Sequence, residues 1–384
     1  MKKQIIYTGL LILLVTGCHC ENTKSFEVRG GEIKITNWNV QTFFDTTTDG
    51  SEYRDFKNNS KWTVQKYETR LQNLVQAMKK IDSDIFVFEE VENKNVVQDI
   101  ANFLAGEWNS KRKYKYTFFE KEKSSAIGLC IFSRFPLRSP KVHSMDIKSL
   151  SNKMPSSRPI VEITADINGK PLTLFINHWK SMSGGKEETE VWRNIQEGTL
   201  YTALNSLNNS DAQRSYLIAG DFNRDILDFY TREKPYVCIR ECVHGDFTNN
   251  SLKVKSLWYL DEAVSENDEA PAAPQKFLQG QKALVSSQEF LASGTSLVSS
   301  QKFLATDETP SSSKPAGTYS YKGEWSKIDN FFCSENICVE KFYIETNGDW
   351  YNSTKDEPNR FALWQDSNFG YSDHLPISCE IYFE

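Results

Sequence analysis

The segment Tyr216-Leu-Ile-Ala-Gly-Asp-Phe-Asn223 joins a short apolar run to a polar end. An uninterrupted apolar run of this length predicts a buried strand, which we place at residues 216–219. Asp221 and Asn223 then follow the strand directly, in the kind of loop that carries many functional side chains. Taken alone, the segment also fits a plain turn in which both polar side chains bond the local backbone.

The same arrangement, a strand next to polar residues, recurs elsewhere in the chain. Carboxylates and amides are hard oxygen ligands for a Mg²⁺-like ion, and histidines transfer protons or donate hydrogen bonds to phosphate oxygens. One such motif is weak evidence, because a glutamate after a strand is usually only solvated. Two of the five histidines fall in these segments, however, so chance explains the set poorly. The polar residues in question are Asn39, Glu89, Glu90, His178, Lys180, Asp329, Asp373 and His374.

The pattern of apolar residues between these motifs predicts a mixed α and β protein. Residues 32–37 alternate polar and apolar side chains, which is typical of a half-buried strand. Residues 63–80 place apolar side chains at helical intervals and lead into the apolar run 85–88. A second helix is expected at residues 190–206. Further strands are expected at residues 127–133, 160–167, 172–177, 328–333 and 375–383.

The composition of the 384 residues indicates a globular protein. Hydrophobic residues make up 39% and charged residues 25%, which argues against general disorder, collagen-like repetition and a multi-span membrane protein. The formal net charge is −6, from 45 Lys+Arg and 51 Asp+Glu. Bulk electrostatics therefore does not favour a polyanion, and a local basic groove or a bound cation would have to hold one.

The N-terminus predicts export. Two lysines precede an apolar run at residues 5–15, which is too short to span a bilayer as a helix and is typical of a signal peptide. The run closes as Leu-Val-Thr-Gly-Cys18, which resembles the lipobox at which bacterial lipoproteins are cut and lipidated. We expect a signal peptide at 1–17, a lipid-attached linker at 18–31, a catalytic domain at 32–384 and a lipid anchor in the bacterial cell envelope. Ordinary secretion, with Cys18 and Cys20 paired or free, is the alternative.

An exported chain can form disulfides, since its compartment is oxidising. Two close pairs, Cys238 with Cys242 and Cys333 with Cys338, could each close a short loop, but spacing alone does not give the connectivity. Neither pair has histidine partners at zinc-site spacing, which makes zinc a minor alternative. Cys130 and Cys379 lie in apolar runs and are expected to be buried thiols.

One stretch departs from the globular texture. At about residues 261–315 the composition shifts to Ser, Ala, Gln, Glu and Pro, and Gln275-Lys-Phe-Leu278 recurs twice in similar form, 13 residues apart each time. Solenoid repeats need about 20 or more residues per unit, so this segment fits a tandem duplication inserted in a surface loop. We interpret it as a disordered or weakly helical insertion, with a binding arm as the alternative.

Five motifs, in this order, resemble the endonuclease/exonuclease/phosphatase superfamily, the relatives of deoxyribonuclease I, abasic-site endonucleases, sphingomyelinases and inositol-polyphosphate phosphatases. The resemblance spans about Ile33 to Ile381. It implies an α+β fold, a four-layer α/β/β/α sandwich of two mostly antiparallel sheets, and a monomer. The segment Gly317–Trp325, followed by Lys327-Ile-Asp329, resembles the subgroup of this superfamily that comprises secreted and lipid-anchored bacterial nuclease-like proteins. The motifs are Asn37–Val40, Glu89–Asn93, Asn177–Ser181, Gly220–Asn223 and Ser372–Pro376.

The resemblance also implies a divalent cation, Mg²⁺ or else Mn²⁺ or Ca²⁺. Asn39 and Glu90 would hold it, and Asp373 would be a further ligand or would support the ligands. Many family members have Gln before the metal-binding Glu. The Glu89 of this chain would therefore add a negative charge beside the ion.

The remaining motif residues would act on the substrate. His374 would be the general base or would orient the nucleophile, and Asp329 would fix its tautomer. His178 and Asn223 would contact the scissile phosphate, while Asp221 would orient the attacking water or assist proton transfer. Two further residues could supply positive charge to the phosphate or could simply be solvated; they are Arg158 and Lys180.

These roles predict metal-dependent hydrolysis of phosphodiester bonds, because a cation and hydrogen-bond donors stabilise the charge that develops on phosphate. An envelope-anchored nuclease acting on DNA or RNA is the first hypothesis. A phosphodiesterase or phosphatase acting on lipid head groups or inositol phosphates is the alternative. A catalytically inactive binding scaffold is a third hypothesis, and the presence of Glu90, Asp221 and His374 argues against it.

Overall fold

The computed structural model describes residues 32–57, 61–107, 113–123, 125–145, 158–229, 234–260, 315–363 and 370–383 of the 384. The predicted signal peptide, the lipidation at Cys18 and all but the last residue of the predicted insertion at 261–315 lie outside these residues. None of the helices in the described ranges is long and apolar enough to cross a membrane.

The first sheet is six-stranded in the described part of the chain. Its strands are β1 (Glu32–Phe43), β2 (Ile85–Val91), β3 (Tyr116–Glu120), β4 (Gly128–Ser133), β14 (Ile337–Ile344) and β17 (Ile377–Phe383). They lie in the order β14-β17-β1-β2-β4-β3. β1 and β2 are parallel to each other, whereas the other neighbouring strands are antiparallel.

The second sheet has seven strands among the described residues. They are β5 (Leu137–His143), β6 (Ile160–Ile167), β7 (Lys170–His178), β8 (Tyr216–Asp221), β9 (Tyr236–Val243), β10 (Asp246–Ser256) and β13 (Asp329–Cys333). Their order is β5-β6-β7-β8-β13-β10-β9, and only the β7–β8 pair is parallel. Two short hairpins accompany the sheets, β11 (Tyr319–Tyr321) with β12 (Glu324–Ser326) and β15 (Tyr351–Asn352) with β16 (Glu357–Pro358).

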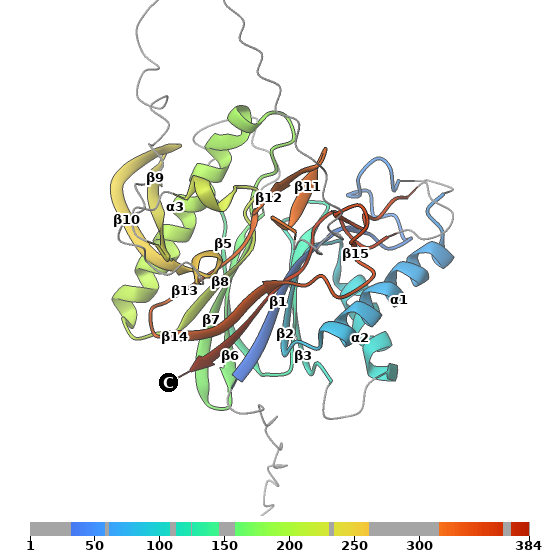
Figure 1. Cartoon of the computed structure of the whole chain (residues 1–384), viewed down its shortest axis with the longest axis horizontal. Coiled ribbons are helices and arrows are strands. Elements are labelled where there is room, and N and C mark those ends of the chain that lie inside the picture. The colour runs from blue at the N-terminus through green and yellow to red at the C-terminus, as the bar shows by residue number, and fades with distance from the viewer. Residues whose placement is uncertain are drawn as a thin grey trace, which may run out of the picture.

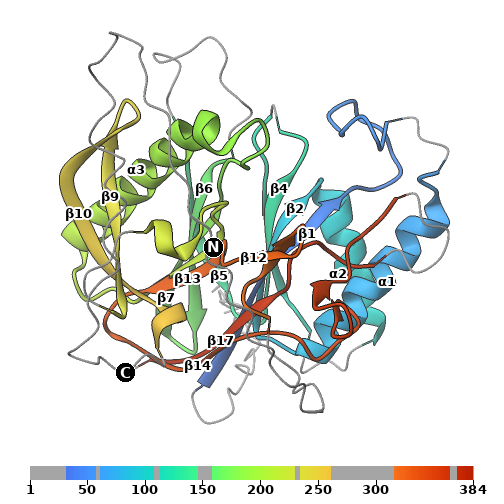
Figure 2. The same ribbon diagram turned by 45° about the horizontal axis from the view of Figure 1, so that its top comes forward.

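Helices cover both outer faces of the paired sheets (Figure 1). The helices α1 (Val64–Ile81) and α2 (Lys94–Glu107) pack on the first sheet, and α3 (Lys186–Ser210) packs on the second. Seen from a second direction, the β9–β10 ribbon curls beside α3 (Figure 2). The result is the predicted four-layer α/β/β/α sandwich, so the fold class is confirmed.

Alternating side chains in single strands produce these layers. In β2, Phe86 and Phe88 pack in a core with α1 and α2, whereas Ile85 and Val87 point the other way, into a core between the two sheets. A strand with apolar residues on both faces is buried on both sides, because successive side chains point to opposite faces.

β8 shows the same division on the second sheet. Leu217 and Ala219 enter the core between the sheets, and Tyr216 and Ile218 enter the core beneath α3. The strand ends at Asp221, which places the first carboxylate of the motif at its C-terminal end.

The expected helix at 63–80 is confirmed, and a side-chain cap explains where it starts. The Thr63 side chain accepts a hydrogen bond from the Lys66 backbone N–H, which satisfies one amide of the first turn. The chain leaves the helix through Asp82, whose φ of 55° is left-handed. The expected helix at 190–206 is also confirmed, although it extends further in both directions, from Lys186 to Ser210.

Several elements were not expected from the sequence. β9 and β10 expose many polar side chains and lack clean alternation, and β3 and β5 are mostly half-buried or exposed. Such strands form because neighbouring strands supply their hydrogen bonds. The remaining unpredicted elements are α2, β11, β12, β14, β15 and β16.

The six cysteines of the described residues are free thiols. The pairs Cys238 with Cys242 and Cys333 with Cys338 are therefore not disulfide-bonded in this structure. Cys130 and Cys379 are fully buried, as expected.

Candidate active site

Three of the expected site residues lie side by side across the second sheet. Asp221 ends β8, and its Cα partners on the neighbouring strands are His178 at the end of β7 and Asp329 at the start of β13. Residues at the same register on adjacent strands point to the same face. All three side chains are buried, so the sheet holds two carboxylates and an imidazole in one row.

His374 joins this row from the other sheet, just before β17. Its Nδ1 lies 2.8 Å from Oδ2 of Asp329, and its Nε2 lies 3.9 Å from Oδ2 of Asp221. Local bonds hold the segment: Trp38 Nε1 donates to the His374 carbonyl (2.9 Å), and the His374 N–H donates to Ser372 Oγ (3.1 Å). Because Nδ1 faces Asp329, Nε2 is the ring nitrogen that faces the rest of the site.

The surroundings of His374 and Asp221 shift both pKa values. Burial alone would lower the pKa of His374, but the charge and hydrogen bond of Asp329, with the charges of Asp221 and Asp373, hold it well above its ordinary value. Burial raises the pKa of Asp221 to about 7, and Asp329 adds to the rise while His374 opposes it. Without a metal ion, these surroundings therefore favour the charged imidazole of His374 beside the carboxyl group of Asp221, which titrates near neutral pH.

Glu90 reaches the site through a bulge between β1 and β2. Asn39 pairs with Glu89, but the register then shifts so that Phe43 pairs with Val91. Glu90 has a φ of 67°, which is rare for a residue other than glycine. Bulges next to active sites re-aim side chains. Here the bulge leaves Glu89 fully buried and turns the Glu90 carboxylate toward the site, with its side chain 18% exposed.

Hydrogen bonds fix the Glu90 carboxylate and join it to Asp221. The Thr42 N–H donates to Glu90 Oε2 at 2.6 Å. Asn39 Nδ2 donates to both Glu90 Oε1 (3.3 Å) and Asp221 Oδ2 (3.0 Å), while Asn39 Oδ1 accepts from the Gln41 N–H (2.9 Å). Asn39 therefore presents its nitrogen, not an oxygen, to the two carboxylates, and it would have to reorient to become an oxygen ligand.

His178 faces the same two carboxylates. Its Nε2 lies 3.7 Å from Glu90 Oε1 and 3.7 Å from Asp221 Oδ2. Burial lowers the pKa of His178 well below its ordinary value, and the charges of Arg158 and His374 add to the effect. A neutral imidazole at this position can donate one hydrogen bond to a substrate.

Asn223 completes the turn after β8. Its N–H donates to Asp221 Oδ1 at 2.8 Å, and its Nδ2 donates to Asp221 Oδ2 (3.1 Å) and to the Trp179 carbonyl (3.2 Å). The simple turn that we considered for this segment is thus present. The same bonds hold Asp221 in place for the site.

The residues present fit a divalent cation. Asp221, Asp329 and His374 each offer one ligand atom, and these atoms lie within 4.8 Å of one another. Oδ1 of Asp329 is buried without a hydrogen-bond partner among the described residues. Glu90 adds a further carboxylate, which the hydrogen bonds of Asn39 hold close to that of Asp221. Oxygen-rich acidic sites of this kind suit a hard cation.

This acidic cluster differs from the ligand set implied by the resemblance. Glu90 lies at the edge of the cluster and Asn39 bridges to it. Asp373 is half-buried next to His374, and it affects the pKa of that histidine only after burial, Asp329 and Asp221. The carboxylates of Asp221 and Asp329 are the ones that the fold brings together.

Glu89, for which we expected a negative charge beside the ion, lies in the protein interior. It is fully buried and accepts one long hydrogen bond, from Asn37 Nδ2 (3.4 Å). Burial, together with the charges of Asp329 and Asp221, raises the pKa of Glu89 well above its ordinary value. The surroundings of Glu89 therefore favour its protonated form over the charged one.

The two expected cationic residues have different surroundings. Arg158 donates to the Trp179 carbonyl at 3.1 Å, and its charge contributes, after burial, to the lowered pKa of His178. Lys180 instead directs Nζ to its own loop, donating to the Ser181 carbonyl (3.2 Å) and the Ser183 carbonyl (3.4 Å). Arg158 is therefore the better placed of the two for a substrate phosphate.

Sequence reasoning missed Arg70 of α1, which supports the bulge. Its guanidinium is buried and donates to the carbonyls of Val40 (2.7 Å) and Thr42 (2.9 Å), and also to that of Gln41. It lies 3.6 Å from the ring centre of Phe361. An arginine on the apolar face of a predicted helix was the available signal.

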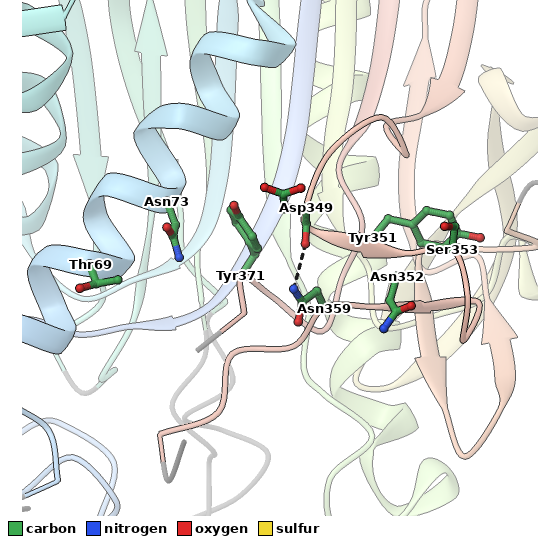
Figure 3. Close-up of a pocket in the computed structure, with 8 residues that line it drawn as sticks. All are labelled: Thr69, Asn73, Asp349, Tyr351, Asn352, Ser353, Asn359 and Tyr371. Carbon is green, nitrogen blue, oxygen red and sulfur yellow. Dashed lines mark hydrogen bonds between the residues drawn. The ribbon is translucent and has the colours of Figure 1, made fainter. Parts of the chain in front are cut away.

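A polar pocket of about 570 Å³ opens elsewhere, between α1 and the β15–β16 hairpin (Figure 3). Asn359 Nδ2 donates across it to the Asp349 carbonyl at 2.9 Å. Tyr371, in its wall, stacks on Trp38 and precedes the His374 segment. None of the expected site residues lines this pocket. Its lining residues are Thr69, Asn73, Asp349, Tyr351, Asn352, Ser353, Asn359 and Tyr371.

The two packed sheets, with a histidine–aspartate pair and clustered carboxylates at their ends, define a protein of the deoxyribonuclease I-like sandwich class. The sequence profile of the endonuclease/exonuclease/phosphatase family matches residues 34–234, more than half of the chain. The chain belongs to this family, as the motifs predicted, and membership implies hydrolysis of phosphate ester bonds.

Solved structures agree with this fold. TDP2 from C. elegans superposes with a TM-score of 0.51 at 14% identity, covering 93% of this chain and 76% of that one. The human nocturnin catalytic domain with bound sulfate superposes with a TM-score of 0.50 at 14% identity, covering 92% and 95%. At these identities the likeness shows the fold alone. No curated protein sequence matches the chain significantly.

Proposed function

We propose that this protein hydrolyses phosphodiester bonds in DNA or RNA with the help of a Mg²⁺-class cation. The observation that carries the proposal is the His374–Asp329 contact of 2.8 Å beside the buried carboxylate of Asp221. A histidine whose tautomer is set by a carboxylate, next to a second carboxylate, is suited to activating or orienting a water molecule.

Glu90, with Asp221 and Asp329, would hold the cation. Bound there, it would neutralise charge on the phosphate oxygens and polarise the scissile bond. Asn39 keeps the carboxylates of Glu90 and Asp221 together through its two hydrogen bonds.

The protein's own donors surround the position that a phosphate would occupy. His178 Nε2 lies 3.7 Å from Glu90 Oε1 and from Asp221 Oδ2, so it faces the same space as the proposed cation ligands. His374 Nε2 faces this space from the other sheet. Donors that are already in place stabilise developing charge without reorganisation, which is why they lower the barrier. Arg158 would add positive charge at the edge of the site.

The aromatic residues near the site support a nucleic acid over a smaller substrate. The Tyr319 ring lies 4.8 Å from the His374 ring, and Tyr321 in the same hairpin is 55% exposed. Exposed aromatic rings can stack on bases, which contributes about 1 to 3 kcal/mol per base. Trp179 is fully buried in the core beneath α3, so it serves the fold.

The cellular part of the proposal rests on the sequence. We place the protein in the bacterial envelope, anchored by a lipid on Cys18, because the signal-peptide pattern ends in a lipobox. Mass spectrometry of the mature N-terminus tests this directly. A diacylated or triacylated Cys18 supports the anchor, and an unmodified N-terminus contradicts it.

The first experiment follows nicking of supercoiled plasmid by the chain that starts after Cys20. Nicking should require Mg²⁺, stop with EDTA and disappear in His374→Ala. Glu68→Gln, an exposed carboxylate of α1, serves as the matched control. If folded protein leaves the plasmid intact but releases product from RNA, the hypothesis that DNA is the substrate is wrong. Turnover of only lipid head groups or inositol phosphates would contradict the nuclease proposal and favour the alternative.

A further inference from the structure

Three carboxylates gather outside the candidate active site. Asp49 and Glu52 lie in the loop that follows β1, and Glu92 directly follows β2. Each offers one ligand atom, and these atoms lie within 4.8 Å of one another. Glu52 is 5% exposed and Glu92 is fully buried, so solvent does little to screen their repulsion.

The loop wraps its backbone amides around these carboxylates. Gly50 N–H donates to Glu52 Oε2 (3.0 Å), and Asp49 N–H donates to Glu52 Oε1. Asp45 N–H donates to Glu92 Oε2 at 2.6 Å, which ties the start of the loop to the end of β2. These bonds shape the loop, but neutral amides do not cancel the carboxylate charges.

One carboxylate oxygen in the cluster has nothing to bond. Oε1 of Glu92 is buried without a hydrogen-bond partner among the described residues. An orphaned buried acceptor costs about 1 to 3 kcal/mol, and more when it is charged. Native proteins rarely leave such an atom unsatisfied, which points to a ligand that this oxygen binds.

We propose that Asp49, Glu52 and Glu92 form a second cation site, which takes a Ca²⁺-class ion. The choice of ion rests on the irregular loop that carries Asp49 and Glu52. Such a loop suits Ca²⁺, since Ca²⁺ accepts variable geometry while Mg²⁺ demands an octahedron.

The site has a route to the active site through the loop that carries it. Tyr53 follows Glu52 directly, and its ring packs against Phe44 with the centres 5.5 Å apart. Burial raises the pKa of the Tyr53 hydroxyl, while the charge of Arg158 and a hydrogen bond with it act in the opposite direction. The loop of Glu52 therefore also carries Tyr53, which interacts with Arg158, the cation that we propose for the substrate phosphate.

Terbium luminescence tests the site without measuring activity. Trp62 Nε1 donates to the Asp45 carbonyl at 2.7 Å, so an indole lies close enough to the cluster to sensitise a bound Tb³⁺ ion. We expect saturable emission that Ca²⁺ displaces more readily than Mg²⁺. Asp49→Asn, at an exposed position that should not disturb folding, and Glu52→Gln should each weaken binding at least about tenfold, because ligand charge sets affinity.

Two controls separate this site from the proposed catalytic ion. Glu90→Gln should keep the emission, and the exposed Glu68→Gln should behave as the unaltered protein does. Folding of each variant is checked by circular dichroism. Emission that disappears in Glu90→Gln but persists in folded Asp49→Asn would overturn the proposal. Absence of saturable emission from the full-length protein would overturn it as well.

Discussion

His374 Nδ1 and Asp329 Oδ2 lie 2.8 Å apart, although the two residues are 45 positions apart in the sequence. Asp329 opens β13 in the second sheet, and His374 precedes β17 in the first. The contact therefore exists only when the two sheets are packed together. A change that moves one sheet relative to the other should therefore also disturb this contact.

Removal of this pair should abolish most of the activity. We expect His374→Ala to lower kcat about 10²- to 10⁴-fold, the usual contribution of a general acid or base. Asp329→Asn should cause a smaller loss, because it leaves the imidazole in place but without its carboxylate partner. The ¹⁵N signals of His374 should report a changed tautomer in Asp329→Asn. Full activity in folded Asp329→Asn would contradict the assigned pairing.

The Glu90 carboxylate should determine how much metal the enzyme needs. Glu90→Gln keeps the shape of the side chain but removes one negative charge. We therefore expect the Mg²⁺ concentration for half-maximal activity to rise at least about tenfold. Asp373→Asn should have the smaller effect, since Glu90 is joined to Asp221 by the hydrogen bonds of Asn39, whereas Asp373 comes after Asp329 and Asp221 among the charges that raise the pKa of His374. Metal titrations of the two variants, read as rate against Mg²⁺ concentration, make the comparison, and equal effects would speak against Glu90 as the main ligand.

The metal-free protein should lose stability as the pH rises toward neutral. Burial raises the pKa of Asp221 from 3.8 to about 7, so the folded state holds this proton more tightly than the unfolded chain does. The stabilisation is complete below a pH of about 3.8 and is lost as the pH rises through about 7. The Asp221→Asn variant has no titratable group at this position, so it does not undergo this loss. In EDTA, the Tm of the variant minus the Tm of the unaltered protein should therefore be larger at pH 8 than at pH 5, by about a few degrees. Parallel Tm curves would refute the expectation.

Gly220 should not tolerate a side chain. Its φ is 147°, and a Cβ would lie 2.0 Å from the Asn177 carbonyl oxygen of β7. Because that contact is with backbone, the two strands would have to separate, which would also move Asp221 away from His178. We expect Gly220→Ala to destabilise the fold by about 3 kcal/mol, the upper range for overpacking. Urea unfolding measures the change, with Gly106→Ala as the control, since a Cβ there meets open space. A loss below about 1 kcal/mol would be inconsistent with the observed strand spacing.

Much of the secondary structure could be predicted because local patterns decide it. Ile85–Phe88 is apolar without interruption, and it forms a strand with a core on each face. The β9–β10 ribbon could not be found in this way, because its polar side chains carry no clear period. The two strands pair with each other as a hairpin, and Lys255 and Ser256 join the ribbon to the distant strand β13. Pairing with neighbouring strands, not local propensity, holds such segments in the sheet.

The candidate residues were likewise visible in the sequence, but their relations were not. Glu89 and Glu90 are chemically identical neighbours, and only the bulge separates a buried carboxyl group with a raised pKa from a metal-ligand candidate. Lys180 and Arg158 are both cations near His178. The charge of Arg158 contributes to the lowered pKa of His178, whereas Lys180 directs its ammonium group to the Ser181 carbonyl. The Asp49–Glu52–Glu92 cluster required β1 and β2 to be adjacent before its members could meet.

The sequence by itself determined the fold class, the family and most of the candidate catalytic side chains, because motif order and apolar period are properties of the chain. The tertiary structure alone decided which groups touch, how deeply each is buried and so which protonation state each prefers. These quantities depend on distances between residues on different strands, and electrostatic interactions in a low-dielectric interior change steeply with such distances.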